Sequence, residues 1–248
     1  MLFRRKPKID YSRMPKHVAF IMDGNGRWAK SRAMPRAYGH KVGVDSVVAI
    51  IKHAQKLGIK YISMFAFSTE NWKRPKEEID EIFRLVRTNL MDKKEDFIKN
   101  NYRLNHMGDI SKLPKDLEQE ILECEEKTKE NTGLVVNFAL NYGSRAEIVN
   151  AVNKAIKDGQ QVTEDSFKNY LYTCDMPDPD LVIRTSGEYR LSNFMLYQLA
   201  YSELYFPKVH WPAFREKELE QAIIEFQSRN RRFGKTQEQI ETNRKDKK

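Results

Sequence analysis

Cysteine is scarce in this chain of 248 residues, which contains Cys124 and Cys174 and no others. Two cysteines that form no CxxC pair are too few for a disulfide framework, so a reducing cytoplasm is the expected compartment. No apolar run approaches the roughly 20 residues that a membrane-spanning helix needs. The first residues, MLFRRKPKID, have no apolar stretch behind their charges, which argues against a signal peptide.

The common nucleotide-binding signatures are also missing. The sequence contains no GxxxxGK[ST], which excludes a Walker P-loop, and no GxGxxG, which removes a dinucleotide-binding site of the usual kind. Zinc-finger, RNP and homeodomain patterns are absent as well. Phosphate or nucleic-acid recognition by these standard motifs is therefore not expected.

The net charge of +9 is concentrated at the two ends of the chain. Residues 1–16 carry six basic side chains and one acid, and residues 229–248 carry eight basic and three acidic ones, which leaves −1 for the residues between them. Basic ends of this kind are usually solvated, and anionic lipid headgroups attract them as well as nucleic acid does. We expect no nucleic-acid partner, and a transient contact with a membrane surface fits the same charge.

Hydrophobic residues make up 40% of the chain, enough for a sizeable core. Short apolar runs alternate with longer amphipathic stretches. Strands are predicted at 17–22, 61–67, 102–107, 134–140, 181–184 and 203–206. Helices are predicted at 39–57, 77–91, 114–128, 145–156 and 216–227. This rhythm predicts a single α/β domain with a mostly parallel sheet flanked by helices on both faces, and ligands of such sheets bind beyond the carboxyl ends of the strands.

A carboxylate and a glycine turn follow the first predicted strand, in the string DGNGRW that begins at Asp23. Glycines let backbone N–H groups approach an anion, and the start of the next helix adds its dipole. Asp23 is then free to bind a Mg²⁺ ion that bridges to phosphate oxygens. The alternative is a tight turn without a ligand. Arg36 and His40 further along suit a diphosphate, although a lone histidine is more often a cap or a surface residue.

Two other predicted strand ends carry polar clusters. The second strand ends in FSTENWKRP, with hydroxyl, carboxylate and amide groups beside Trp72 and Arg74; a helix N-cap is the alternative, and both can hold. The strand LVIR leads into TSGEYRLSNF, whose arginines and hydroxyls predict a second oxyanion site. Glu203, in AYSELYF, is either paired, half-exposed or a metal ligand. Together these clusters suggest two phosphorylated substrates that meet in an apolar cleft.

Six segments in order along the chain resemble the cis-prenyltransferase family: HVAFIMDGNGRWAK, GH, FAFSTENWKRP, NYGSR, DLVIRTSGEYRLSNF and YSELYF. The resemblance predicts a catalytic domain at 16–234, between a basic arm at 1–15 and a polar, charged tail at 235–248. It implies a sheet of about six mainly parallel strands flanked by helices, assembled as a homodimer. The trans-prenyltransferases, with DDxxD motifs on an all-helical fold, do not match.

The resemblance implies a Mg²⁺-dependent enzyme that repeatedly condenses isopentenyl diphosphate with an allylic diphosphate, farnesyl diphosphate being the expected primer. Its product would be a long-chain Z-polyprenyl diphosphate such as undecaprenyl diphosphate, the lipid carrier precursor for cell-wall synthesis. The enzyme would be cytoplasmic or peripheral at the inner face of the membrane. Two rival functions remain open from the residues alone: a Mg²⁺-dependent phosphohydrolase, and a phospholipid-binding module without chemistry.

Roles follow from the resemblance residue by residue. Asp23 would bind Mg²⁺ and help the allylic diphosphate leave, with Glu203 as a second metal ligand. Asn71 would be the proton acceptor, although an amide is a poor base at neutral pH. The allylic substrate would bind at Gly24, Asn25, Gly26, Arg27, Trp28, Arg36 and His40. Further substrate contacts would come from Ser68, Thr69, Glu70, Trp72 and Arg74. The isopentenyl diphosphate would bind at Arg184, Arg190, Leu191 and Ser192.

Three further features bear on the active site. The string RFG at 232–234 resembles a C-terminal segment that reaches the active site of the partner subunit in this family. Tyr189 stands where some relatives carry a histidine, and Thr69 where many carry a serine; both changes keep a polar group. Leu134, Val136 and Phe138 are candidates for the floor of an apolar tunnel that sets product length.

Overall fold

A computed structural model describes residues 7–229, except for the side chains of residues 90–93. Six strands form one sheet in the order β3-β4-β2-β1-β5-β6, and every neighbouring pair is parallel. The strands are β1 (His17–Ile21), β2 (Tyr61–Ser68), β3 (Arg103–Met107), β4 (Val135–Tyr142), β5 (Leu181–Arg184) and β6 (Glu203–Tyr205). The predicted parallel α/β sheet is confirmed.

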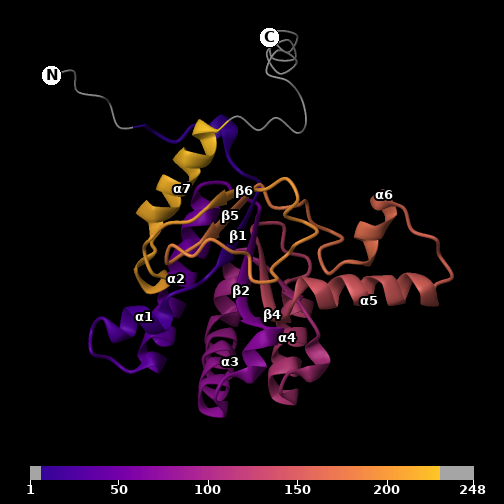
Figure 1. Cartoon of the computed structure of the whole chain (residues 1–248), viewed down its shortest axis with the longest axis horizontal. Helices are drawn as coiled ribbons and strands as arrows, with labels where there is room; N and C mark the ends of the chain where they lie inside the picture. Colours follow the sequence, from indigo (N-terminus) through magenta and orange to yellow (C-terminus); the bar gives the residue numbers. More distant parts are fainter. Residues whose placement is uncertain (1–6, 230–248) are drawn as a thin grey trace, which may run out of the picture.

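The helices are α1 (Asn25–Lys30), α2 (Arg36–Lys56), α3 (Lys76–Lys99), α4 (Lys115–Thr128), α5 (Ser144–Lys157), α6 (Glu164–Phe167) and α7 (Glu216–Ser228). The alternating pattern predicted five of them, and the short helices α1 and α6 were not predicted. Among the described residues, helices connect the first five strands, whereas β5 leads to β6 without one. Two short 3-10 helices matter for the site, η2 (Thr69–Lys73) and η5 (Trp211–Ala213). Helices α2, α3 and α4 each begin directly after a proline, which fixes the backbone at the helix start. In Figure 1, α1 and α5 lie at opposite ends of the long axis.

The larger part of the core lies between one face of the sheet and helices α2, α3, α4 and α7. Phe20 and Ile62 from the strands, Ile50 from α2 and Leu117 from α4 are among its fully buried members. Every residue of β1 is buried. Strands that are covered on both faces need such unbroken apolar runs, which is why HVAFI could be recognised as a strand from its sequence.

The other face of the sheet is covered differently from the prediction. Its core cluster contains Phe194, Met195 and Leu199, which come from an irregular segment that follows β5 rather than from a long helix. Ser192, Asn193 and Met195 all have positive φ angles, a conformation that cannot continue an α-helix. Apolar side chains spaced along this segment therefore reach the sheet through turns, which helical periodicity does not predict.

The strand order decides which loops meet. Strand β1 lies between β2 and β5, so the segments that follow these three strands emerge at the same edge of the sheet. These are the segments that begin at Met22, Thr69 and Thr185. Among the helices in the described residues, none is long and apolar enough to cross a membrane.

Candidate active site

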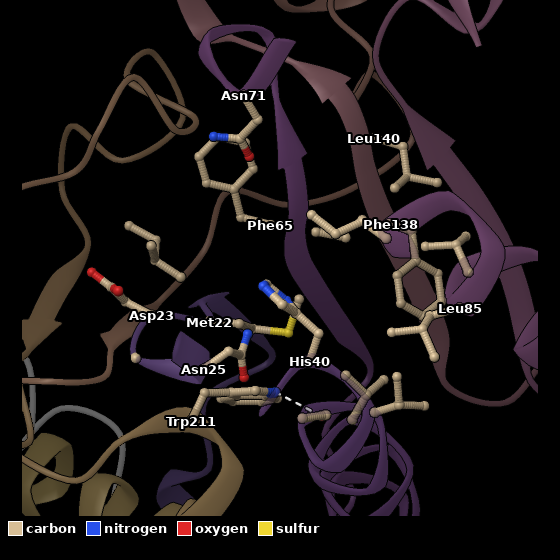
Figure 2. A pocket seen from close by; sticks show the side chains of 18 of the residues that line it. Met22, Asp23, Asn25, His40, Phe65, Asn71, Leu85, Phe138, Leu140 and Trp211 are labelled. Atoms are coloured by element: carbon tan, nitrogen blue, oxygen red, sulfur yellow. Dashed lines mark hydrogen bonds between the residues drawn. The ribbon is translucent and has the colours of Figure 1, made fainter. Parts of the chain in front are cut away.

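A cavity of about 940 Å³ opens at the carboxyl ends of the central strands. Its polar lining includes thirteen of the residues predicted from the sequence: Asp23, Gly24, Asn25, Gly26, Arg27, Arg36, His40, Ser68, Asn71, Arg74, Arg184, Arg190 and Ser192. Figure 2 shows Asp23 and Asn71 on one side of the cavity, with Leu85, Phe138 and Leu140 across from them. One cavity therefore combines charged and amide groups with a large apolar wall.

The apolar part of the cavity extends under helix α2 toward the edge strand β3. Its lining includes Val44, Val47, Val48, Ile51, Ile82, Leu85, Val86, Leu104, Ile121, Phe138 and Leu140. Because β3 is the strand furthest from β5 on that side of the sheet, Leu104 and Ile121 mark the inner end of the cavity. Of the three predicted floor residues, Phe138 lines the cavity, whereas Leu134 and Val136 are buried in the core.

Asp23 is held between two arginines. Arg184 Nη2 donates to Asp23 Oδ2 over 2.9 Å, and Arg27 Nη2 donates to Asp23 Oδ1 over 3.0 Å. Burial acts to raise the pKa of Asp23, but the hydrogen bonds from Arg184 and Arg27 outweigh it, and the pKa lies below its ordinary value. The carboxylate is therefore charged at neutral pH and lies between the two predicted diphosphate sites.

The predicted clamp around Arg184 is present. This arginine is 3% exposed, and its Nη1 donates to the carbonyl of Arg190 over 2.6 Å and to Ser192 Oγ over 2.7 Å. Glu188 then joins the two sites, since it accepts from Arg27 and from Arg190 at 2.5 Å each. These hydrogen bonds lower the pKa of Glu188, with Arg190 as the larger cause. The result is a row of alternating charges that links the two predicted diphosphate sites.

Glu78, at the start of α3, lies beside two arginines and a histidine of the predicted allylic site. Its Oε1 lies 2.9 Å from Arg74 Nη1, 3.2 Å from Arg36 Nε and 3.6 Å from His40 Nε2. Burial lowers the pKa of His40, and Glu78 opposes this only in part, so the ring is neutral at pH 7. Without substrate, one carboxylate thus offsets only part of the positive charge of the two arginines.

Asn71 lines the cavity, but its side-chain oxygen already has a partner. Asn71 Oδ1 accepts from the main-chain N–H of Ser68 over 3.1 Å, which closes the start of η2. This segment is both a helix cap and a part of the cavity wall, because Ser68 and Asn71 cap η2 and face the cavity. An amide whose oxygen is used in this way is better suited to orient a ligand than to accept a proton.

Several other predicted residues do not line the cavity. Trp72 packs on Phe67 and Phe83 and donates from Nε1 to Asn141. Trp28 stacks on Tyr38. The remaining members of this group are Thr69, Glu70 and Leu191. Their positions support the walls of the site, and a direct contact with substrate stays a prediction for each.

The structure does not bring Glu203 to Asp23 within one chain. Glu203 is the first residue of β6 and pairs with Leu181 at the start of β5, whereas Asp23 bonds to Arg184 at the end of β5. Three residues of strand separate these levels by about 10 Å. Glu203 instead accepts from Arg229 Nη1 over 3.0 Å. Glu203 is therefore a paired carboxylate, one of the three expected alternatives, and no contact among the described residues of this chain supports a role as a metal ligand beside Asp23.

Sequence reasoning did not single out Glu78 and Glu188 as members of the site. Glu78 had a local signal, because it lies four residues after Arg74 in the first turn of a helix, a spacing that favours an ion pair. Glu188 lies within a quoted motif, but its contact with Arg27 spans 161 residues of sequence. No local pattern could have indicated that pair.

Comparison with known proteins places this geometry in a family. A profile described as "Putative undecaprenyl diphosphate synthase" matches residues 21–234. The isoprenyl transferase of Clostridium tetani is 50% identical over 236 residues, covering 92% of each chain. The isoprenyl transferase of Bacillus cereus is 50% identical over 228 residues, covering 89% of this chain and 88% of the relative.

Solved structures agree with these sequence matches. Lavandulyl diphosphate synthase from Lavandula x intermedia, in complex with dimethylallyl diphosphate, superposes with a TM-score of 0.87 at 36% identity, covering 90% of this chain and 99% of that one. A "probable undecaprenyl diphosphate synthase" from Campylobacter jejuni superposes with a TM-score of 0.77 at 39% identity, covering 90% and 100%. The chain belongs to the undecaprenyl diphosphate synthase (isoprenyl transferase) family of cis-prenyltransferases.

Proposed function

We propose that this cis-prenyltransferase extends farnesyl diphosphate with isopentenyl diphosphate units to a long-chain Z-polyprenyl diphosphate, undecaprenyl diphosphate being the expected product. The observation that carries the proposal is the cavity, whose opening is rich in arginine and whose interior is a long apolar space. Arginine forks suit diphosphates, and an apolar interior suits a growing hydrocarbon. A similar solved structure contains dimethylallyl diphosphate, a small allylic diphosphate, which supports an allylic substrate here.

Asp23 fits the requirement for Mg²⁺. This ion usually takes one or two protein carboxylates and completes its coordination with water and substrate phosphates. Among the described residues no group of three or more histidine, cysteine or acidic side chains is close enough to hold a metal, so a site made by the protein alone is not supported. Asp23, charged and facing the cavity, would bind the ion together with the diphosphate. When bound, Mg²⁺ supplies positive charge that stabilises the departing diphosphate.

The arginines on the allylic side prepare the departure of the diphosphate. Arg27, Arg36 and Arg74 are paired with Glu188 or Glu78 before substrate binds. A diphosphate carries more negative charge than one carboxylate and accepts several N–H donors, so it competes well for these groups. As the carbon–oxygen bond weakens, these fixed cations stabilise the charge that develops on the leaving group.

The residues after β5 position the second substrate. Arg184 is fixed by Asp23, Ser192 and the carbonyl of Arg190, so its orientation is set before substrate arrives. Together with Arg190 it would hold isopentenyl diphosphate with its alkene facing the allylic carbon. Asn71 would orient the new unit, and an oxygen of the departing diphosphate is the better acceptor for the proton that is lost.

Assembly, location and domain limits belong to the same proposal. We infer a homodimer, in which Glu203 and the RFG segment of one chain act at the active site of the other. The RFG segment lies outside the described residues. We also infer a catalytic domain at 16–234, a cytoplasmic location, and a transient contact of the basic ends with the membrane surface during product release.

One assay separates the proposal from its rivals. The purified protein is incubated with farnesyl diphosphate, radiolabelled isopentenyl diphosphate and Mg²⁺, and dephosphorylated products are resolved by thin-layer chromatography. Chain growth to a defined long polyprenol is expected. Release of orthophosphate without chain growth would identify a phosphohydrolase, and absence of any reaction with retained phospholipid binding would identify a non-catalytic module.

A further inference from the structure

The main-chain carbonyl of Asp23 accepts three hydrogen bonds. Thr185 Oγ1 donates to it over 2.6 Å, Ser186 Oγ over 2.9 Å, and the N–H of Trp211 over 3.0 Å. The three donors come from two separate segments, one after β5 and one at the start of η5. Such a set holds the peptide bond that follows Asp23 in one orientation.

The orientation of that peptide determines where Gly24 N–H points. The carbonyl of residue 23 and the N–H of Gly24 lie in one plane and point in opposite directions, because the bond is trans. Gly24 lines the cavity, and its N–H has no acceptor among the described residues. Because the Asp23 carbonyl is fixed on one side of this peptide, the Gly24 N–H is a free donor that points to the opposite side.

His210 contacts the Ser186 hydroxyl, one of the donors to the Asp23 carbonyl, and was not among the site residues predicted from the sequence. Its Nδ1 is 2.8 Å from Ser186 Oγ. The hydroxyl has one proton, and when it donates that proton to the Asp23 carbonyl, Nδ1 is the donor in the contact with Ser186. Burial lowers the pKa of His210, and Arg27 lowers it further, which agrees with a neutral ring.

The packing around Gly24 shows how close the side chains of Ser186 and His210 lie to the backbone of this glycine. Gly24 has φ of +104°, and a Cβ added there would lie 2.0 Å from Ser186 Oγ and 2.8 Å from His210 Nδ1. Ser186 itself has φ of +77°, an uncommon conformation for a residue other than glycine. The hydroxyl is therefore held at this point by its two hydrogen bonds as well as by its backbone.

We propose that His210 is a positioning residue for prenyl transfer: its Nδ1–H holds the Ser186 hydroxyl on the Asp23 carbonyl, and this aims the Gly24 N–H at the departing diphosphate. The inference rests on the proposed function, because only that function makes a departing diphosphate the acceptor for the Gly24 N–H. The interaction becomes stronger as charge develops on the leaving group, so its loss acts mainly on kcat.

Two substitutions of His210 distinguish a hydrogen-bond donor at the position of Nδ1 from a side chain that only fills space. In His210→Asn the amide nitrogen takes the place of Nδ1, whereas in His210→Gln it takes the place of Nε2. We expect His210→Asn to retain kcat within about threefold and His210→Gln to lose about tenfold, the size of one neutral hydrogen bond. The KM for isopentenyl diphosphate should stay unchanged in both. His53→Gln, a histidine on α2 that pairs with Glu220, is the matched control and should behave as wild type.

Ser186→Ala completes the test and serves also if His210→Gln does not fold. It should lower kcat to about the same extent as His210→Gln, and the double variant should lose no more than either single one, since both act through one contact. Equal activity of His210→Asn and His210→Gln, whether high or low, would overturn the proposal, as would additive losses in the double variant. Absence of chain growth in the wild type would instead overturn the proposed function.

Discussion

Arg184 Nη2 and Asp23 Oδ2 lie 2.9 Å apart, and this ion pair joins the ends of two neighbouring strands. Strands β1 and β5 are in register at Ile21 and Arg184, which places Asp23 two residues beyond the paired region. The pair brings the candidate metal ligand of the allylic site into contact with the clamp for the second substrate. Electrostatic changes at either site are therefore felt at the other.

Asp23→Asn should nearly abolish prenyl transfer and leave the fold in place. Asparagine keeps one oxygen that Arg184 can donate to, but it removes the charge that would bind Mg²⁺ and support the leaving group. The expected loss in kcat is on the order of 10²–10³ or more. EDTA should stop the wild-type reaction and added Mg²⁺ should restore it, whereas no Mg²⁺ concentration should restore the variant. Near-normal turnover of Asp23→Asn would remove Asp23 from the mechanism.

Two exposed arginines offer a matched test of the two substrate sites. The side chains of Arg190 and Arg36 are 58% and 60% exposed, so neither substitution leaves a deeply buried group unpaired. Arg190→Ala should raise the KM for isopentenyl diphosphate by roughly ten- to a hundredfold, and Arg36→Ala should do the same for the allylic primer. Arg184→Ala should affect both substrates, because this buried arginine also holds Asp23. If Arg190→Ala impairs the primer instead, the two sites are interchanged.

The basic C-terminal segment should be needed for turnover in a partner subunit. A truncation after Arg229 keeps the contact of that residue with Glu203 and removes residues 230–248, the RFG string among them. Turnover should fall sharply in detergent without lipid, whereas a truncation after Thr236 should retain most activity.

Mixed dimers show whether this segment acts across subunits. The chain truncated after Arg229 is combined with a full-length Asp23→Ala chain. In a mixed dimer, one subunit then lacks the tail and the other lacks the Asp23 carboxylate. Activity should return, because the intact tail of one chain serves the intact Asp23 site of the other. Heterodimers that form and stay inactive would show that the tail works within its own chain or not at all.

Product length should respond to the inner end of the cavity. Leu104 and Val136 are cross-strand partners and both are buried, but only Leu104 lines the cavity. Leu104→Ala should shift products to longer chains, because it removes atoms at the point where the hydrocarbon would stop. Val136→Ala is the control. It should also lower the stability of the protein, but thin-layer chromatography should show no change in the length of the product. Equal product distributions in the two variants would place the length limit elsewhere.

Stability should fall in mild acid because of His17. Burial lowers the pKa of this histidine to about 4, while its ring bonds to Ser63 and to the carbonyl of Pro177. The unfolded chain takes up a proton near pH 6.5 and the folded chain does not, so the free energy of unfolding decreases as the pH falls from 6.5 toward 4.

The expected loss is about 1.4 kcal/mol per pH unit, or about 2 kcal/mol between pH 6.5 and pH 5. It is measured by urea unfolding of the wild type and of His17→Gln, which has no titrating group at this position. The wild type should lose more stability than the variant over this interval. An equal loss in both proteins would mean that other groups, such as the buried His106, determine the acid sensitivity.

Much of the fold and most of the site could be predicted from the sequence. The buried strands are nearly continuous apolar runs, and the polar strings DGNGRW and FSTENWKRP directly follow two of them, so the carboxyl ends of the strands marked the site. The second face of the sheet could not be predicted, because its apolar cover comes from turns with positive φ angles, which have no helical or strand period.

The sequence by itself determined the six strands, the five longer helices and the chemical groups placed after the strands, because these depend on local periodicity and on residue type. Only the tertiary structure decided which of those groups meet. The strand order places β1 between β2 and β5, and this brings Arg27 to Glu188 and Ser186 to His210, while Glu203 is left at the opposite end of the sheet, paired with Arg229. Such contacts join residues far apart in the chain, and their geometry is set by strand order and register, which a local pattern does not encode.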